Sequence, residues 1–425
     1  MNFLLLCVLC GYVSAYNLIV QVNHRYLNSC FEDLREWIVA YMRSNQIGGE
    51  FHQTLRTGSI KATDLQITNL TLRFASLEHH RGEHYVQMKG FNIKLKGNWY
   101  YKLFYIITDS GTFSLSVDDM NITIGNIEPE VFSGLPFINT DLNCKTFYGS
   151  FAFSLDRPKT LSNILSRFMY RLMRNKFEST ICMEVTRAFD AFLRHGVEQL
   201  SFRHALPSGA VLNNSLVSKP LLSAEGDLTT YHYGIVKEST MPVAELSPLE
   251  RRPHDVTYLL KPQLLEEILS TIHQKSLFDG SYKDDLQYSL TVKCIKRPEV
   301  RLEGEGIITI LDERFVVTSN NIVLLNDTFA IGLLLKALYS HRLQLRFQVL
   351  QFSSMDFLIE NLQRKFASKL QRQWSTVIGT YLRIPLPCAF GILARNASLT
   401  IDKFFIVFAV NIDPQIHHNS IRSLS

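Results

Sequence analysis

The chain has 425 residues, of which 46% are hydrophobic, 20% are charged and 11% are aromatic. Its formal net charge at pH 7 is +5, and basic and acidic residues are spread evenly between its two halves. This length allows two domains. The even charge argues against nucleic-acid binding and against a strong polyanion site.

The first fifteen residues, MNFLLLCVLCGYVSA, are typical of a secretory signal peptide. An apolar run precedes small residues at Val13 and Ala15, which favours cleavage before Tyr16. A buried N-terminal strand is the less favoured interpretation. No later apolar run approaches the ~18 residues that a membrane span needs. We therefore expect residues 1–15 to be removed and the mature chain to be secreted and extracellular.

The first half follows the order helix, strands, helix. A helix is predicted from about Asn23 to Arg43, and alternating strands are predicted from Phe51 to Ser154. A long helix is then expected to start near Thr160, a plausible N-cap. The apolar stripes of these two helices comprise Leu27, Phe31, Leu34, Ile38 and Tyr41, then Leu161, Leu165, Phe168, Leu172, Ile181, Val185, Phe189 and Phe192.

The second half repeats this order after a segment, residues 204–254, that is predicted to be irregular. Pro262 opens a helix, since proline is tolerated in a first helical turn. Strands follow through Phe352, then a long helix and a final strand-rich segment. The predicted organisation is residues 16–240 as one domain, 241–254 as a linker and 255–425 as a second domain. The apolar stripe of the last long helix comprises Phe357, Leu358, Leu362, Phe366, Leu370, Trp374 and Ile378.

Five N-x-S/T sequons are candidate glycosylation sites in a secreted chain. Asn69 and Asn121 each alternate with apolar neighbours, so they are expected on the polar face of a strand. The full set is Asn69, Asn121, Asn213, Asn326 and Asn396.

A stretch from His80 to His84 matches the H-x-x-E-H pattern of some zinc peptidases. That pattern requires a helix, so that both histidines share one face. Here it lies between two alternating strands, so a hairpin is predicted and no metal is expected, although His79, His80 and His84 could form a surface metal site. There is no G-x-S-x-G motif and no phosphate loop. A lipase is therefore a disfavoured third hypothesis, and we expect no enzymatic activity and no cofactor.

Several segments together resemble the bactericidal/permeability-increasing and lipopolysaccharide-binding protein family, which includes the cholesteryl ester and phospholipid transfer proteins. These segments are FNIKLKGNWYYK followed by GTFSLSVDDMNI, LMRNKFESTICMEV, HDVTYLLKPQLLEEIL and the closing IPLP. The resemblance implies an α+β fold, an elongated boomerang of two curved antiparallel β-barrels. Each barrel would be packed on a long helix, and a central sheet would join them where the first and last strands meet.

The resemblance also implies a disulfide between Cys144 and Cys182. Closing a loop of 38 positions would stabilise the fold by roughly 4 kcal/mol on the chain-entropy model. Cys294 could pair with Cys388, but sequence does not fix this connectivity. Cys30, on the first helix, is more typical of inert packing.

Each barrel is further expected to hold phospholipid-like lipid in an apolar pocket beneath its helix. Ordinary core packing is the alternative for every residue of the apolar stripes. The candidate pocket-lining residues are Leu27, Phe31, Leu34, Phe168, Leu172, Leu362 and Phe366.

One segment departs from the lipopolysaccharide-binding members, which carry several lysines at the tip of the first barrel. KLKGNWYYK keeps Lys94, Lys96 and Lys102 but has Trp99, Tyr100 and Tyr101 between the last two. Aromatic residues favour a membrane interface, so these six residues are predicted to form a membrane-contacting loop. Trp99 could instead fold back onto the barrel.

The function favoured by the sequence is a secreted lipid-binding and lipid-transfer protein. Its expected partners are phospholipids and membrane or lipoprotein surfaces. The alternative is an innate-defence protein that binds bacterial lipopolysaccharide or other envelope lipid.

Overall fold

A computed structural model describes most of the chain. The described residues are 16–44, 51–55, 58–80, 83–104, 106–125, 129–132, 135–138, 143–156, 162–198, 202–235, 252–284, 288–304, 306–340, 343–353, 360–387, 394–402 and 404–412. The predicted signal peptide, residues 241–251 of the predicted linker and Cys388 lie outside them.

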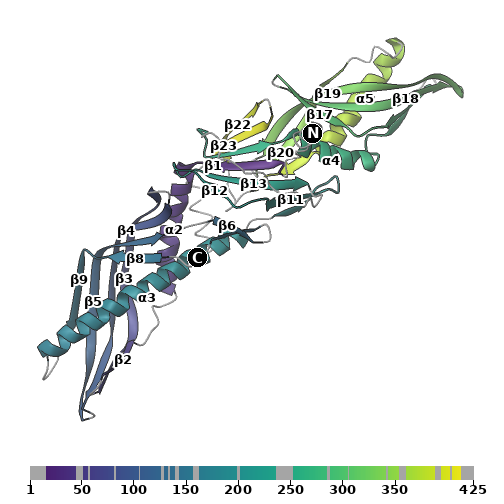
Figure 1. Cartoon of the computed structure of the whole chain (residues 1–425). Coiled ribbons are helices and arrows are strands. Elements are labelled where there is room, and N and C mark those ends of the chain that lie inside the picture. Colours follow the sequence, from purple (N-terminus) through teal and green to yellow (C-terminus); the bar gives the residue numbers. More distant parts are fainter. Residues whose placement is uncertain are drawn as a thin grey trace, which may run out of the picture.

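The N-terminal half is a long antiparallel sheet with two helices on one face (Figure 1). Its strand order is β2-β3-β4-β5-β8, and β9 also pairs with β5. Helix α2 (His24–Ser44) packs on β3 and on α3 (Ser162–Glu198), which in turn contacts β8 and β9. The strands are β2 (Phe51–Leu55), β3 (Gly58–His80), β4 (Glu83–Leu103), β5 (Ile107–Gly125), β8 (Asn143–Phe147) and β9 (Ser150–Leu155), with a separate hairpin of β6 (Pro129–Phe132) and β7 (Leu135–Ile138).

The C-terminal half repeats this plan with shorter elements. Its sheet has the order β15-β16-β18-β19-β20-β21, and β17 pairs with β18. Helix α4 (Pro262–Gln274) contacts β17, and α5 (Glu360–Tyr381) contacts β15 and β20. The strands are β15 (Gly280–Lys283), β16 (Tyr288–Cys294), β17 (Glu299–Glu303), β18 (Gly306–Ser319), β19 (Ile322–Ser340), β20 (Gln344–Phe352) and β21 (Arg383–Pro385).

A third sheet lies between the two halves and takes strands from both ends of the chain (Figure 1). Its order is β10-β11-β13-β1-β14-β23-β22, and β12 also pairs with β13. The first strand is thus separated from the last by β14 alone. The strands are β1 (Leu18–Val22), β10 (Arg203–Ala205), β11 (Val211–Leu216), β12 (Leu221–Leu222), β13 (Leu228–Ile235), β14 (Val256–Leu260), β22 (Ala394–Ile401) and β23 (Ile406–Ile412).

The expectation that residues 204–254 are irregular is therefore wrong for β10 to β13. These strands are short or polar on one face, so their alternation is weak in the sequence. Strand β13 is stabilised by pairing with β1, more than 200 positions earlier in the chain, as the pair Leu18 and His232 shows, and β11 and β12 pair in turn with β13.

The central sheet is covered on both faces, which explains why the first three residues of β1 are all apolar and do not alternate with polar ones. Leu18 and Val20 belong to the core that fills the C-terminal half, whereas Ile19 belongs to a small cluster on the opposite face with Tyr231 and Val407. A separate core fills the N-terminal half between its sheet, α2 and α3. The resulting molecule is the elongated two-barrel boomerang that the family resemblance implies (Figure 1). Within the described residues, no helix combines the length and apolar character that crossing a bilayer requires.

Candidate functional site

An apolar cavity of about 420 Å³ lies where the C-terminal sheet meets the central sheet. This volume falls within the ~300–1,000 Å³ range of small-molecule sites. Its only charged lining residues, Glu303 and Lys336, are exposed side chains. The remaining lining comes from β18, β19, β20 and β22: Gly306, Ile307, Leu334, Leu335, Ala337, Leu350, Leu399 and Ile401.

The local backbone opens this cavity. The pairing of β19 with β20 shifts register between Leu334 and Leu335, which leaves Leu350 of β20 as an extra, unpaired residue that lines the cavity. Gly306 leaves room for the Leu334 side chain, because a Cβ there would lie 2.7 Å from a methyl carbon of Leu334. An acyl chain in this cavity would contact aliphatic side chains while its polar end faced Glu303 and Lys336.

The interior of the N-terminal half is rich in methionine. Met is flexible and fills irregular gaps, so such a core can adapt its packing. The core of the C-terminal half contains none among its buried residues. The buried methionines of the N-terminal core are Met42, Met88, Met120, Met169 and Met173, each at most 2% exposed. Apolar periodicity in the sequence does not distinguish these methionines from other core residues.

The predicted pocket-lining residues are not brought into the described cavity. Leu34 and Phe366 are fully buried in the N-terminal and C-terminal cores respectively. Phe31 and Leu172 are half-buried and pack against the N-terminal core, and Leu27 is half-buried on α2. The side chains of Phe168 and Leu362 lie outside the described part. The residues that line the cavity come from strands, whereas the sequence-based set came from helices.

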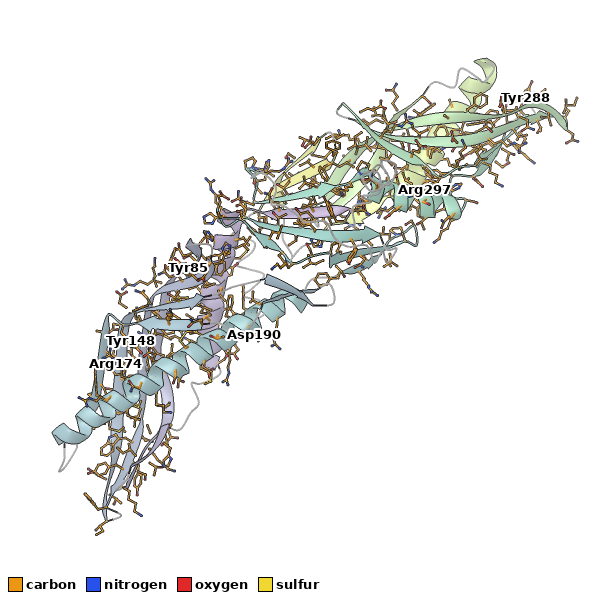
Figure 2. All side chains as sticks on the ribbon, in the orientation of Figure 1. Tyr85, Tyr148, Arg174, Asp190, Tyr288 and Arg297 are labelled. Atoms are coloured by element: carbon orange, nitrogen blue, oxygen red, sulfur yellow. A yellow bond between two sulfur atoms is a disulfide. The ribbon has the colours of Figure 1, made fainter. Side chains whose placement is uncertain are left out.

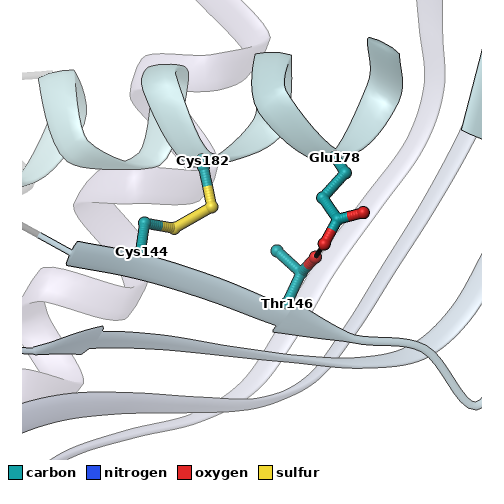
Figure 3. Close-up of a disulfide and its surroundings, with 4 residues drawn as sticks. All are labelled: Cys144, Thr146, Glu178 and Cys182. Carbon is teal, nitrogen blue, oxygen red and sulfur yellow. Dashed lines mark hydrogen bonds between the residues drawn. A yellow bond between two sulfur atoms is a disulfide. The ribbon is translucent and has the colours of Figure 1, made fainter. Parts of the chain in front are cut away.

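A disulfide joins Cys144 on β8 to Cys182 on α3, as the family resemblance implied (Figure 3). One helical turn away, Thr146 Oγ1 donates a hydrogen bond of 2.9 Å to the Glu178 carboxylate. The long helix is thus fastened to the sheet over the N-terminal core by two neighbouring links. Cys30 and Cys294 are free thiols, and burial raises the pKa of each to about 12, so neither is a ready nucleophile or ligand.

The predicted membrane-contacting loop is part of strand β4, so its side chains alternate between two faces. Trp99 and Tyr101 are each 1% exposed and stack on the inner face, and Trp99 Nε1 donates to the Thr112 carbonyl at 3.0 Å. The prediction that these two rings contact a membrane is therefore wrong. The strand continues to Leu103 because β3 and β5 pair with it on both sides.

The outer face of this segment carries the polar residues of the same prediction. Lys94 and Lys96 are exposed, Tyr100 is 40% exposed and Lys102 is half-buried. Their partners on β5 are serines and threonines, as Ser114 opposite Lys96 illustrates. This face is a basic row bordered by hydroxyl groups, a pattern suited to phosphate groups.

The true hairpin tip lies immediately beyond β4, at the end of the N-terminal half opposite the central sheet (Figure 1). Phe104 has a φ of +48° and is 61% exposed, and Ile106 is 84% exposed. Two large apolar side chains are therefore exposed at this turn. The signal in the sequence was the uncharged run LFYII that follows Lys102.

The histidine pattern is confirmed as part of a hairpin. His79 on β3 pairs in register with His84 on β4, and their Nδ1 atoms lie 3.3 Å apart. Burial and the neighbouring His79 lower the pKa of His84. No group of three metal-ligating side chains exists within the described residues. Among the sequons, Asn69, Asn326 and Asn396 are exposed, while Asn121 and Asn213 are half-buried.

The fold defines a class of elongated, two-barrel proteins whose halves are joined by a central sheet. No family model matches the sequence. The chain is 28% identical over 132 residues to a bactericidal permeability-increasing protein of Sebastes schlegelii, a match that covers 31% of this chain and only 28% of that relative. The crystal structure of lipopolysaccharide binding protein covers 94% of this chain and 99% of its own, with a TM-score of 0.56 and 14% identity.

A weaker likeness, with a TM-score of 0.32 and 10% identity, is to P47 of Clostridium botulinum E1, covering 94% of this chain and all of that one. The resemblance to the bactericidal/permeability-increasing and lipopolysaccharide-binding protein family is confirmed by the first two comparisons.

Proposed function

We propose that this protein is a secreted, non-enzymatic lipid carrier that holds phospholipid-like lipid in an apolar cavity. It transfers that lipid, or presents it, at membrane or lipoprotein surfaces. The observation that carries this proposal is the cavity between the C-terminal and central sheets, whose lining is aliphatic apart from Glu303 and Lys336. Each buried CH₂ of an acyl chain would contribute about 0.8 kcal/mol. The disulfide supports an extracellular location, because such bonds persist in oxidising compartments.

Filling the cavity should displace lipid without unfolding the protein. Ala337→Phe places a ring among Leu335, Leu350 and Leu399, and we expect photoactivatable phosphatidylcholine labelling of the C-terminal half to fall about tenfold. Peptide mapping by mass spectrometry measures this labelling. Leu338→Phe is a matched control, since Leu338 is the next residue on the strand and is 41% exposed. Undiminished labelling of a folded Ala337→Phe variant would remove this cavity as the lipid site.

The exposed hairpin tip is the proposed contact between the N-terminal half and a lipid surface. Replacing Phe104 and Ile106 with Ser should weaken binding to phosphatidylcholine vesicles by about tenfold at both low and high salt, because the lost interaction is apolar. Co-flotation with vesicles measures this. Trp99 is buried, so its own emission should change little on vesicle addition. If binding is unchanged in the double variant, the tip is not a contact.

A second candidate function is recognition of bacterial lipopolysaccharide, favoured by the basic row of Lys94, Lys96 and Lys102. Charge-driven binding is screened by salt, whereas apolar insertion is not. A Lys94→Gln/Lys96→Gln variant that loses binding to lipopolysaccharide but keeps binding to neutral vesicles would support this function. Equal affinity of the wild-type protein for both surfaces in moderate salt would favour the carrier.

A further inference from the structure

The far end of the C-terminal half exposes a second apolar tip. Strands β18 and β19 form a hairpin that extends to that end of the molecule (Figure 1). It turns at Asn320 and Asn321, whose φ angles are +50° and +66°. The next three residues, Ile322, Val323 and Leu324, are 65%, 56% and 47% exposed. We call these three residues the C-terminal tip.

Both faces of the hairpin are apolar at this point. Successive side chains of a strand point to opposite faces, so Ile322 and Val323 lie on different sides. Thr318 pairs with Val323 but Val317 pairs with Leu325, so Leu324 is the extra residue of a β-bulge. A β-bulge changes the direction of a side chain, and here the redirected side chain is the apolar Leu324. A flat partner protein would cover one face, whereas a hydrocarbon phase surrounds both.

Charge is absent from the whole hairpin end. No charged residue occurs between Arg314 and Asp327. At about 3.3 Å per residue, Asp327 lies roughly 16 Å along the strand from Ile322. The three apolar residues of the C-terminal tip can therefore enter the outer part of a leaflet, in a ~30 Å hydrocarbon core, without burying a charge of the hairpin itself. Asn326, a candidate glycan acceptor, would stay on the water side.

The neighbouring strand supplies an aromatic side chain of the kind found at membrane interfaces. Tyr288 of β16 pairs with Ser319 at the base of the turn (Figure 2). Asp284, whose backbone N–H donates to the Tyr288 carbonyl, and the adjacent Lys283 lie close by, so the two charges beside the tip balance, which favours a neutral surface. The N-terminal tip differs, because Lys102 lies two positions before Phe104 at the end of β4.

We propose that the C-terminal tip inserts into a neutral, phosphatidylcholine-like lipid surface. Because it lies at the opposite end from Phe104 and Ile106, one molecule can bridge two lipid surfaces. This inference rests on the proposed function only in taking lipid surfaces as the protein's partners. Lipid carried in the cavity is not required for bridging.

Tethering of two vesicle populations tests the proposal. Phosphatidylcholine vesicles are immobilised, and dye-labelled vesicles of the same lipid are captured by added protein. Replacing Ile322, Val323 and Leu324 with Gln, which creates no new N-x-S/T sequon beside Asn320 and Asn321, should lower capture at least tenfold while co-flotation through the N-terminal tip persists. Ile295→Ser is the control, since Ile295 is 41% exposed in the same half but away from the hairpin end.

A reporter tests insertion directly. Trp99 and Trp374 are buried and Trp37 is partly buried, so a new tryptophan at the tip dominates any vesicle-induced change. Val323→Trp emission should shift to the blue on adding phosphatidylcholine vesicles, and Ile295→Trp emission should not. An unshifted Val323→Trp, or capture unaffected by the triple substitution, overturns the inference. Purified protein that tethers vesicles but yields no extractable lipid would instead refute the carrier function alone.

Discussion

Replacing Cys144 with Ala should lower the free energy of unfolding by roughly 4 kcal/mol, the chain-entropy value for a 38-residue loop. The bond fastens α3 to β8 over the N-terminal core, so the loss should appear first as unfolding of that half. Secretion should fall as well, since a destabilised chain is retained and degraded. Urea denaturation followed by far-UV circular dichroism measures the stability change.

Two controls separate the disulfide from its surroundings. Thr146→Val removes only the hydrogen bond to Glu178 and should cost about 1 kcal/mol. Cys30→Ala removes a free thiol on α2 and should likewise lower the free energy of unfolding by about 1 kcal/mol. If the denaturation midpoint of Cys144→Ala matches that of Thr146→Val, the disulfide contributes little beyond local packing.

Replacing Glu313 with Gln should stabilise the protein at pH 8 by up to about 4 kcal/mol. Glu313 is fully buried on β18, where Trp374 Nε1 donates to one carboxyl oxygen at 3.0 Å. The other oxygen, Oε2, has no hydrogen-bond partner among the described residues. Burial raises the pKa of Glu313 from 4.5 to about 8, and the hydrogen bond from Trp374 opposes this only in part.

The sign of the pH effect follows from this raised pKa. Between about pH 4.5 and 8 the folded protein keeps the proton that the unfolded chain releases, so stability falls as pH rises through this window. Gln has nearly the same shape as Glu, and its side-chain oxygen can accept the hydrogen bond from Trp374 Nε1. Unlike Glu, it has no carboxyl proton to release. Thermal unfolding from pH 4 to 9 should show a flatter curve for Glu313→Gln, and an unchanged slope for Glu303→Gln at the exposed cavity mouth. Parallel curves for wild type and Glu313→Gln would show that Glu313 titrates normally.

Periodicity was sufficient to locate the helices. The spacing of Leu34 and Ile38 predicted α2 within one residue at each end, because an amphipathic stripe must face a core. Proline at position 262 correctly marked the first turn of α4. The disulfide between Cys144 and Cys182 was recovered through the family resemblance and not from spacing.

The position of the hairpin tips required the tertiary structure. Alternation in KLKGNWYYK already places Trp99 and Tyr101 on one face and the lysines on the other, but the segment was interpreted as a loop. Only the pairing of β4 with both neighbours shows that the strand continues to Leu103 and that Phe104 and Ile106 form the turn. A short-range pattern gives no information on where a neighbouring strand ends.

The sequence by itself determined the helix faces and the strand-rich halves, since these follow from local periodicity and composition. Tertiary structure alone decided three features. The register of β18 directs the Glu313 side chain into the core, at a position where an apolar residue would be expected. The meeting of β19 with β22 creates the apolar cavity. The run Ile322 to Leu324, which resembles a buried strand in the sequence, is exposed at the end of the hairpin. Each depends on contacts between distant segments, and the free energy of such contacts is not encoded in any local pattern.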